Sequence, residues 1–456
     1  MKLNGNNEIN NRCDSKQTGI TLIALVVTIV VLLILAGVTL NALFNENGVL
    51  IKSKNTGNIM EDAKQSDLDA VNDLDRWIDE KTGTKTTKKT KITDSSLTSN
   101  DRTTTESKTV IAKDEKGNQV VVPGGFKISA NSGDTVQEGV VIEDKEGNQF
   151  VWVPVSNINN DGSNQIIKDD GTTVEITLGR YTFNGKYNFK TKKVEGTGEP
   201  TLVQKGLEYE DVTVANVDDG TVNTKYKIEN YFYELSDKNR LSDEKENTAT
   251  NTTAKDLESF ITKTNENKGF YIARYEASYG SGYNADGTTT VEKYGNAKPL
   301  SKVSTECSKN GMNYTTGTLW KRITQPQAAM VSKNMYDGNK YVESDLINSY
   351  AWDTAIVYIQ AMGNDNYANA NRDANGNTTL KNTGETGDQV CNIFDMAANL
   401  CEWTTEYSTY AVGGACTSPN RGGHYNASYY YTDYRRSDFA TDSSDFISFR
   451  PILYLK

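Results

Sequence analysis

Histidine and cysteine are scarce in this chain of 456 residues, and each shortage excludes a class of site. The single histidine, His424, cannot supply the two or three imidazoles of a typical zinc or iron centre. It is also the only candidate base for a serine or cysteine nucleophile. No Cys-x-x-Cys pair occurs, so a structural zinc site is not expected; the five cysteines are Cys13, Cys307, Cys391, Cys401 and Cys416. Most hydrolase mechanisms are therefore disfavoured.

Clusters of basic residues are almost absent as well. The formal net charge is -11 and the isoelectric point is about 5.0. Binding to phosphate backbones needs clustered lysine and arginine, so nucleic acid is not expected as a partner. The one dense basic run, residues 85–91, lies in a threonine-rich stretch and fits a solvated spacer better than a binding patch.

Long apolar runs are missing too, with one exception at residues 20–44. Residues 20–40 carry no charge, and a helix of that length spans the roughly 30 Å hydrocarbon core of a bilayer. Lys2, Arg12 and Lys16 precede the run, which favours a cytoplasmic N-terminus. We expect a single-pass protein of the cell membrane whose C-terminal part is extracellular, where disulfides among the four later cysteines can persist in a pairing that spacing does not reveal.

A small residue stands directly before this run rather than after it. The segment Gly19-Ile20-Thr21-Leu22-Ile23 resembles the type IV prepilin signal. The resemblance implies that a prepilin peptidase cuts between Gly19 and Ile20, removes the leader 1–19 and leaves the apolar helix in place. The family usually has glutamate at the fifth mature position, which pairs with other pilin subunits during assembly, and here that position is Ala24. Entry into a filament and a simple membrane anchor both stay open.

Beyond the apolar run, the pattern changes three times. Residues 45–80 predict a stalk helix, and 81–111 a disordered Thr/Lys-rich linker with too few apolar residues to fold. Residues 112–456 predict one domain, with 156–265 as a long insertion. Within it, the segments 114–123 and 144–154 each predict a Gly-Asn turn followed by a short strand that ends at proline. Helices are expected at 257–264, 325–333 and 345–362, the second with Thr324 as its N-cap, and a strand at 269–276.

Four blocks in the second half of the chain follow one another in a recognisable order. They are Gly269-Phe-Tyr-Ile-Ala-Arg-Tyr-Glu-Ala277, Val390-Cys-Asn-Ile-Phe-Asp-Met-Ala-Ala-Asn-Leu-Cys-Glu-Trp-Thr404, Arg421-Gly-Gly-His-Tyr425 and Ser448-Phe-Arg-Pro451. These blocks resemble the formylglycine-generating enzyme, or sulfatase-modifying factor, family. The resemblance implies a C-type-lectin-like fold. The expected class is thus α+β: an N-terminal transmembrane helix, a flexible linker and a lectin-like domain with an insertion. Within it, Trp403 is expected in the core and Arg450 as a buried hydrogen-bond hub.

The resemblance does not extend to the oxidising chemistry of that family. The enzymes carry two copper-binding cysteines after the Gly-Gly block, and the matching positions here are Ala427 and Thr432. Neither side chain is a soft ligand for copper, and one histidine cannot build the iron site of a related branch. We therefore expect no copper, no iron and no catalytic residues. A cysteine oxidase with a non-standard site is the enzymatic alternative.

Calcium is the one metal that the resemblance implies. The matching ligands are the side chains of Asp395 and Glu402 and the carbonyls of Ala398 and Leu400. Hard oxygen donors of this kind suit Ca²⁺. The family's usual glycine is Ala398 here and its usual tryptophan is Cys401. The competing interpretation is that both carboxylates only hydrogen-bond a turn.

The stretch that borders the active-site groove in the enzymes is rich in tyrosine and small polar residues. Rigid aromatic rings with polar tips favour contacts to sugars and proteins. The expected function is binding of an extracellular protein or glycan. The binding part is a catalytically inactive lectin-like head that a membrane-anchored or pilin-like protein displays. A minor pilin with a purely structural head, whose tyrosines form an inert surface, is the further alternative. The candidate ligand-binding residues are His424, Asn426, Tyr429, Tyr430, Tyr431, Asp433 and Tyr434.

Overall fold

The computed structural model describes residues 108–156, 165–205, 208–209, 232–234, 254–280, 297–307, 316–373, 376–408 and 418–456. The chain divides into two units between Lys88 and Lys89, and every described residue lies in the second. Its class is α+β with more strand than helix, as expected. Among these residues no helix has the length and apolarity needed to cross a membrane. The predicted leader, transmembrane helix and stalk, and the linker up to residue 107, lie outside the described residues.

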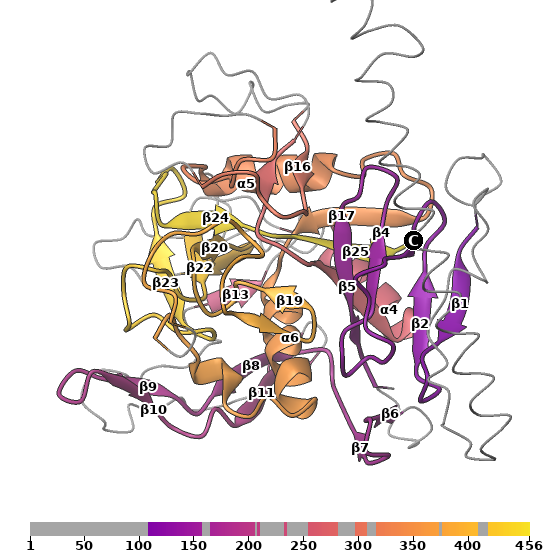
Figure 1. Cartoon of the computed structure of the whole chain (residues 1–456), viewed down its shortest axis with the longest axis horizontal. Coiled ribbons are helices and arrows are strands. Elements are labelled where there is room, and N and C mark those ends of the chain that lie inside the picture. The colour runs from indigo at the N-terminus through magenta and orange to yellow at the C-terminus, as the bar shows by residue number, and fades with distance from the viewer. Residues whose placement is uncertain are drawn as a thin grey trace, which may run out of the picture. The chain divides into compact units, whose positions relative to one another are not determined.

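A six-stranded sheet forms the centre of this unit (Figure 1). Its strand order is β17, β25, β14, β5, β4, β3, and neighbouring strands run antiparallel. Consecutive apolar residues make the central strands buried on both faces. The bounds are Lys127–Ile128 (β3), Val141–Glu143 (β4), Gln149–Pro154 (β5), Gly269–Ala273 (β14), Val342–Leu346 (β17) and Pro451–Leu455 (β25).

Both predicted Gly-Asn turns are confirmed as hairpin turns with one shared internal bonding pattern. The strand β1 (Val110–Lys113) pairs with β2 (Gln119–Val122), and β4 pairs with β5. In the first turn Asp114 accepts hydrogen bonds from the backbone N–H and side-chain amide of Asn118, both at 2.8 Å. In the second turn Asp144 and Asn148 repeat the same two bonds at the same lengths.

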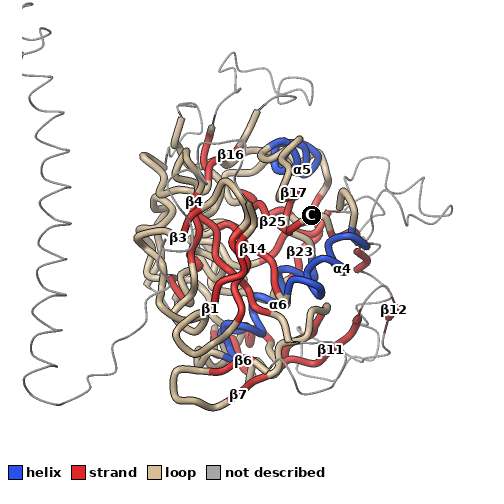
Figure 2. The backbone as a smooth tube through the Cα atoms, turned by 90° about the vertical axis from the view of Figure 1, so that its right-hand side faces the viewer, coloured by secondary structure: helices blue, strands red, loops and turns tan. Residues whose placement is uncertain are grey.

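Three α-helices surround the central sheet. α4 (Leu257–Asn267) packs on β14 and β25, α5 (Gln325–Asn334) packs on β17, and α6 (Ser349–Ala361) contacts β5. In Figures 1 and 2 α5 lies above α6, and β17 and β25 lie at heights between them. Thr324 caps α5 through a capping box with Gln327, as the sequence predicted. A short 3-10 helix, η5 (Tyr367–Asn369), follows α6.

The helix predicted over 345–362 is wrong at its beginning. Residues 345 and 346 belong to the strand β17, and the helix starts four residues later, with Asn348 as its N-cap accepting from the backbone N–H of Ala351 at 2.9 Å. The reason is tertiary, because β17 forms a full five-residue ladder with β25. Local periodicity alone cannot detect that pairing.

A second sheet of four strands carries most of the blocks that defined the family resemblance. Its order is β23, β22, β20, β24, with β20 and β24 parallel. Trp403 in β20 is fully buried, and its indole N–H donates to the carbonyl of Ile323 at 2.8 Å, which confirms the expected core role. The bounds are Cys401–Trp403 (β20), Ser418–Arg421 (β22), Arg435–Asp438 (β23) and Ile447–Phe449 (β24). Two further strand pairs are β15 (Ser278–Tyr279) with β16 (Pro299–Leu300) and β18 (Gln389–Val390) with β19 (Ile393–Phe394).

The predicted insertion is joined to the rest of the unit by buried side chains as well as strand pairing. Its strand β13 pairs with β21 (Glu406–Ser408), which lies outside the insertion. Arg180 from β8 is fully buried against Glu406. The bounds are Ile166–Ile167 (β6), Thr173–Val174 (β7), Arg180–Phe183 (β8), Lys186–Asn188 (β9), Lys193–Glu195 (β10), Pro200–Lys205 (β11), Glu208–Tyr209 (β12) and Phe232–Glu234 (β13).

Candidate ligand-binding face

The loop 424–434 between β22 and β23 holds all seven predicted ligand-binding residues, but the structure divides them by accessibility. Tyr429 is 42% exposed, Asn426 is exposed, and Asp433 and Tyr434 are half-buried. His424, Tyr430 and Tyr431 are buried, because their rings pack against one another and against neighbouring rings. The accessible part of the predicted set is therefore narrower than the sequence suggested.

The ring of His424 packs against other aromatic rings, and one of its nitrogens accepts a hydrogen bond. Its ring lies 4.8 Å from the ring of Tyr430 and 4.9 Å from that of Phe446, centroid to centroid. Its Nδ1 accepts the backbone N–H of Asn426 at 3.2 Å. Burial, together with the nearby charges of Arg436 and Arg372, lowers the pKa of His424 to about 4. The imidazole is neutral at physiological pH, and that fits its role as an acceptor in the loop.

Hydrogen bonds from the loop 424–434 to neighbouring segments hold it in place. The backbone N–H and the hydroxyl of Thr432 both donate to the carbonyl of Ala370, at 3.0 and 3.2 Å. The indole N–H of Trp352 donates to the carbonyl of Thr432 at 2.9 Å. Gly422 adopts φ +80°, and a Cβ there would lie 2.5 Å from the carbonyl oxygen of Met396. A glycine is thus required where the chain enters the loop.

Ala427 and Thr432, the two positions that the resemblance matched to copper-binding cysteines, have other contacts here. Ala427 is buried, and Thr432 is hydrogen-bonded to the chain beneath it. The nearby thiol of Cys401 donates to the carbonyl of Gly422 at 3.4 Å, and burial raises its pKa far above the ordinary value. Burial also raises the pKa of Cys391 to about 12. Neither of these two thiols is poised to become the thiolate that copper binding requires.

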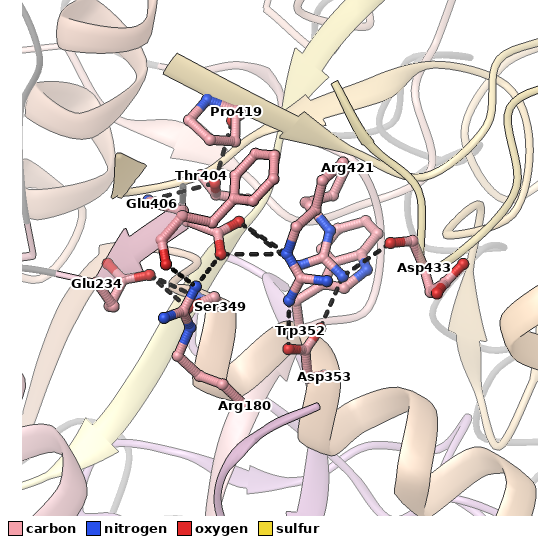
Figure 3. A network of polar contacts seen from close by, with 12 residues as sticks. Arg180, Glu234, Ser349, Trp352, Asp353, Thr404, Glu406, Pro419, Arg421 and Asp433 are labelled. Carbon is pink, nitrogen blue, oxygen red and sulfur yellow. Dashed lines mark hydrogen bonds and ion pairs between the residues drawn. The ribbon is translucent and has the colours of Figure 1, made fainter. Parts of the chain in front are cut away.

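A buried network of charges supports this loop and joins it to the insertion (Figure 3). Arg421 donates to Asp353 at 2.7 Å, and Arg435 donates to the other oxygen of Asp353 at 2.6 Å. Glu406 forms ion pairs with Arg180 and with Arg435, and the distance from the Nε of Arg435 to the Oε1 of Glu406 is 3.1 Å. Burial opposes ionisation of Glu406, but the surrounding arginines outweigh it and hold its pKa below the usual value. The strands β8, β22 and β23 are therefore tied together electrostatically under the exposed face.

The predicted calcium segment is buried, and both of its carboxylates already have protein partners. Asp395 accepts hydrogen bonds from the hydroxyls of Thr383, at 2.7 Å, and Thr386. Glu402 receives Arg450 through Nη2 at 2.6 Å and Nε at 3.0 Å. Arg450 also donates to two backbone carbonyls, which confirms the expected hydrogen-bond hub.

A third buried carboxylate, that of Glu276, interacts electrostatically with both Asp395 and Glu402. Glu276 accepts the side-chain amide of Asn399 at 2.5 Å and the backbone N–H of Leu400 at 3.0 Å. Burial, followed by the charges of Asp395 and Glu402, raises the pKa of Glu276 well above the ordinary value. Three fully buried carboxyl groups thus share Arg450, which leaves an excess of negative charge that protons or a cation must balance. No group of three or more acidic, histidine or cysteine side chains in the described ranges has the arrangement of a metal site. Calcium at Asp395, Ala398, Leu400 and Glu402 would require both outer carboxylates to exchange partners, and it stays a prediction.

The sequence reasoning missed the residues that hold the loop in place. Arg180 and Glu234 lie in the insertion, and Asp353 lies in a helix whose apolar residues attracted attention instead. Glu234 accepts the N–H and hydroxyl of Ser349 at 2.8 and 2.7 Å, although 115 residues separate them. No local spacing signals such pairs. A charged residue inside an otherwise apolar strand or helix is the sequence signal that could have indicated these buried ion pairs.

Comparisons with known proteins add little to this geometry. The chain matches no protein-family model and no curated protein. Among solved structures it overlaps a chain titled "Crystal Structure of CarF" at 14% sequence identity. The overlap covers 41% of this chain and 87% of that chain with a TM-score of 0.25, which is too low to support an argument about fold or function.

Proposed function

We propose that this protein is a cell-surface protein whose second unit is a catalytically inactive, lectin-like head that binds an extracellular protein or glycan. The observation that carries the proposal is the loop 424–434, which presents Tyr429 and Asn426 on a rigid base. A binding surface gains affinity when its contact groups are already ordered, because less conformational entropy is lost on association. The proposed lectin-like fold rests on the four sequence blocks.

The inactive character of the head is part of the proposal. Thr432 is engaged with Ala370, and the buried thiols of Cys391 and Cys401 are strongly disfavoured as thiolates. Oxidation of a substrate cysteine needs metal ligands that these side chains do not offer. Recognition without covalent chemistry requires nothing more than the exposed face.

We further propose that residues 20–44 anchor the protein in the membrane after a prepilin peptidase removes residues 1–19. Replacing Gly19 with valine should block the cut, because the peptidase would no longer find a small residue there. N-terminal sequencing of the membrane-bound protein should give Ile20 for the native chain and residue 1 or 2 for the variant. An unprocessed native N-terminus would contradict the processing step, and recovery of the protein in the soluble fraction would contradict the anchor.

The binding proposal is tested with purified full-length protein on glycan and surface-protein arrays. Tyr429→Ala should weaken binding to whichever ligand is found by roughly tenfold or more, the effect expected for an aromatic contact. Ile111→Ala removes a side chain that is 68% exposed in β1 and serves as the matched control. Equal binding by native protein and Tyr429→Ala to every ligand would refute the proposed face.

A further inference from the structure

The aromatic contacts of the loop 424–434 continue into the insertion through Tyr187, which is itself buried. The ring of Tyr429 lies 5.9 Å from that of Tyr187 in β9, and Tyr187 lies 4.9 Å from Phe189 at the tip of the β9–β10 hairpin. On the other side Tyr429 lies 4.5 Å from Tyr430. Phe189 is 61% exposed and Tyr429 is 42% exposed, so two accessible aromatic rings contact the same ring of Tyr187.

The hairpin that carries Phe189 is held by specific contacts. Its base is fixed by the side-chain amide of Asn369, which donates to the carbonyl of Asn184 at 3.1 Å. Its two strands are joined by the side-chain bond from Asn188 to Glu195 at 2.9 Å. Figure 1 shows β9 and β10 projecting from the rest of the unit at the lower left. A projecting but braced hairpin presents its tip at low entropic cost.

The tip of the hairpin is basic in an otherwise acidic chain. Lys190, Lys192 and Lys193 at the tip are all exposed. The carboxylate of Glu195 bonds to Thr191 at 2.9 Å, so lysines outnumber carboxylates in the hairpin without excluding them. The whole chain carries a net charge of -11. A local positive cluster beside an exposed ring favours a ligand with negative charges next to flat apolar faces.

A shallow pocket with a mixed polar and apolar lining adjoins the base of the same hairpin. It has a volume of about 310 Å³ and is lined by Asn364, Asp365, Asn366, Tyr367, Asn369 and Ala370. The hairpin approaches it closely, since a Cβ on Gly198 would lie 2.6 Å from the side-chain oxygen of Asn366. The asparagine carboxamides can donate to and accept from sugar hydroxyls, and the carboxylate of Asp365 can accept from them.

We infer that the ligand is an acidic polysaccharide and that the β9–β10 hairpin forms half of its site. Phe189 and Tyr429 stack on the apolar faces of sugar rings, the tip lysines pair with carboxylate or sulfate groups, and the pocket takes hydroxyl groups of a neighbouring sugar. This inference rests on the proposed function, because it uses the same face and narrows the ligand class. It also gives the insertion a role in recognition.

The experiment measures binding of the purified full-length protein to immobilised heparin and polygalacturonate, with dextran as the neutral counterpart. Phe189→Ala and the triple variant Lys190→Gln, Lys192→Gln, Lys193→Gln should each reduce binding to the acidic polymers about tenfold or more. The triple variant should also flatten the dependence of binding on salt concentration. Ile111→Ala and Lys145→Gln, which removes a lysine whose side chain is 67% exposed in another hairpin, should bind like the native protein.

Two results would overturn this inference and leave the proposed function standing. One is acidic-polymer binding that Tyr429→Ala weakens and the hairpin variants do not. The other is binding to a protein or to a neutral glycan alone, lost in Tyr429→Ala. If none of these variants weakens binding to any ligand, both the inference and the proposed face fail. Circular dichroism and thermal unfolding of each variant distinguish lost binding from lost folding.

Discussion

Glu234 offers a sharp test of how the insertion is joined to the rest of the unit. Its carboxylate is buried and accepts two hydrogen bonds from Ser349, and Thr405 contacts its other oxygen. Burial, followed by the charge of Glu406, raises the pKa of Glu234 from 4.5 to about 7. Glu234→Gln replaces the carboxyl group with an amide of the same shape that resembles the protonated acid.

The sign of the pH effect follows from the direction in which this pKa moves. A pKa that is higher in the folded state means that the folded protein holds the proton more tightly. The associated stability is complete below about pH 4.5 and is lost as the pH rises through about 7. A tenfold change in proton affinity corresponds to about 1.4 kcal/mol, so the full effect is about 3 kcal/mol. Asp388, whose pKa burial also raises to about 7, adds to the same trend.

The assay is urea unfolding of the purified full-length protein at several values between pH 5 and pH 9. The native free energy of unfolding should fall across this range, and Glu234→Gln should remove about 2–3 kcal/mol of the fall. Glu146→Gln, at a glutamate whose side chain is 55% exposed, should leave the slope unchanged. Parallel curves for native protein and Glu234→Gln would refute the reasoning, because they would mean that Glu234 titrates alike in the folded and unfolded chain.

Three further predictions concern the core around Arg450 and the buried thiols. Arg450→Met should lower the free energy of unfolding, measured in urea, by about 3–5 kcal/mol, because it leaves the buried carboxylate of Glu402 without its ion-pair partner. The control Arg322→Ala breaks an exposed ion pair and should lower it by at most about 1 kcal/mol. Comparable losses for the two variants would contradict the role of Arg450 as a buried hub. If calcium binds the predicted site, a concentration one hundred times its Kd should stabilise the protein by about 2.7 kcal/mol and raise its Tm. Asp395→Asn should abolish this rise. A Tm that does not change with calcium would contradict the predicted calcium site. Because the pKa of Cys391 is raised to about 12, a thiol reagent at pH 8 should modify it only as urea unfolds the chain. Peptide mapping that finds Cys391 itself rapidly labelled in the native protein would contradict its burial.

Local chemistry explains which parts of the fold the sequence could predict. The capping box at Thr324 and the paired Asp-Asn turns of 114–118 and 144–148 are formed by residues within a few positions of one another. Such signals survive in the sequence because the interaction partners are neighbours. The strand β17 was missed because its identity depends on β25, about a hundred residues later.

The loop proposed as a binding face can be found in the sequence, but its accessible residues cannot. Composition located the tyrosine-rich loop, but it could not tell that Tyr430 and Tyr431 pack inward while Tyr429 points outward. The ion pairs beneath the loop could not be predicted from the sequence, because Arg180 and Glu406 are 226 positions apart. The ring contact between Tyr187 and Tyr429 likewise joins two segments that no local pattern connects.

The place of β25 in the central sheet has a consequence for biogenesis. This strand, residues 451–455, lies between β17 and β14 and bonds to both. The sheet therefore cannot close until the ribosome has made these residues, and its partner β14 must wait through almost two hundred intervening residues. Such long-range closure slows folding and prolongs the life of unpaired strand edges. Until β25 is made, the edges of β14 and β17 that it covers lack these partners, and such open edges are where pairing with another chain can begin.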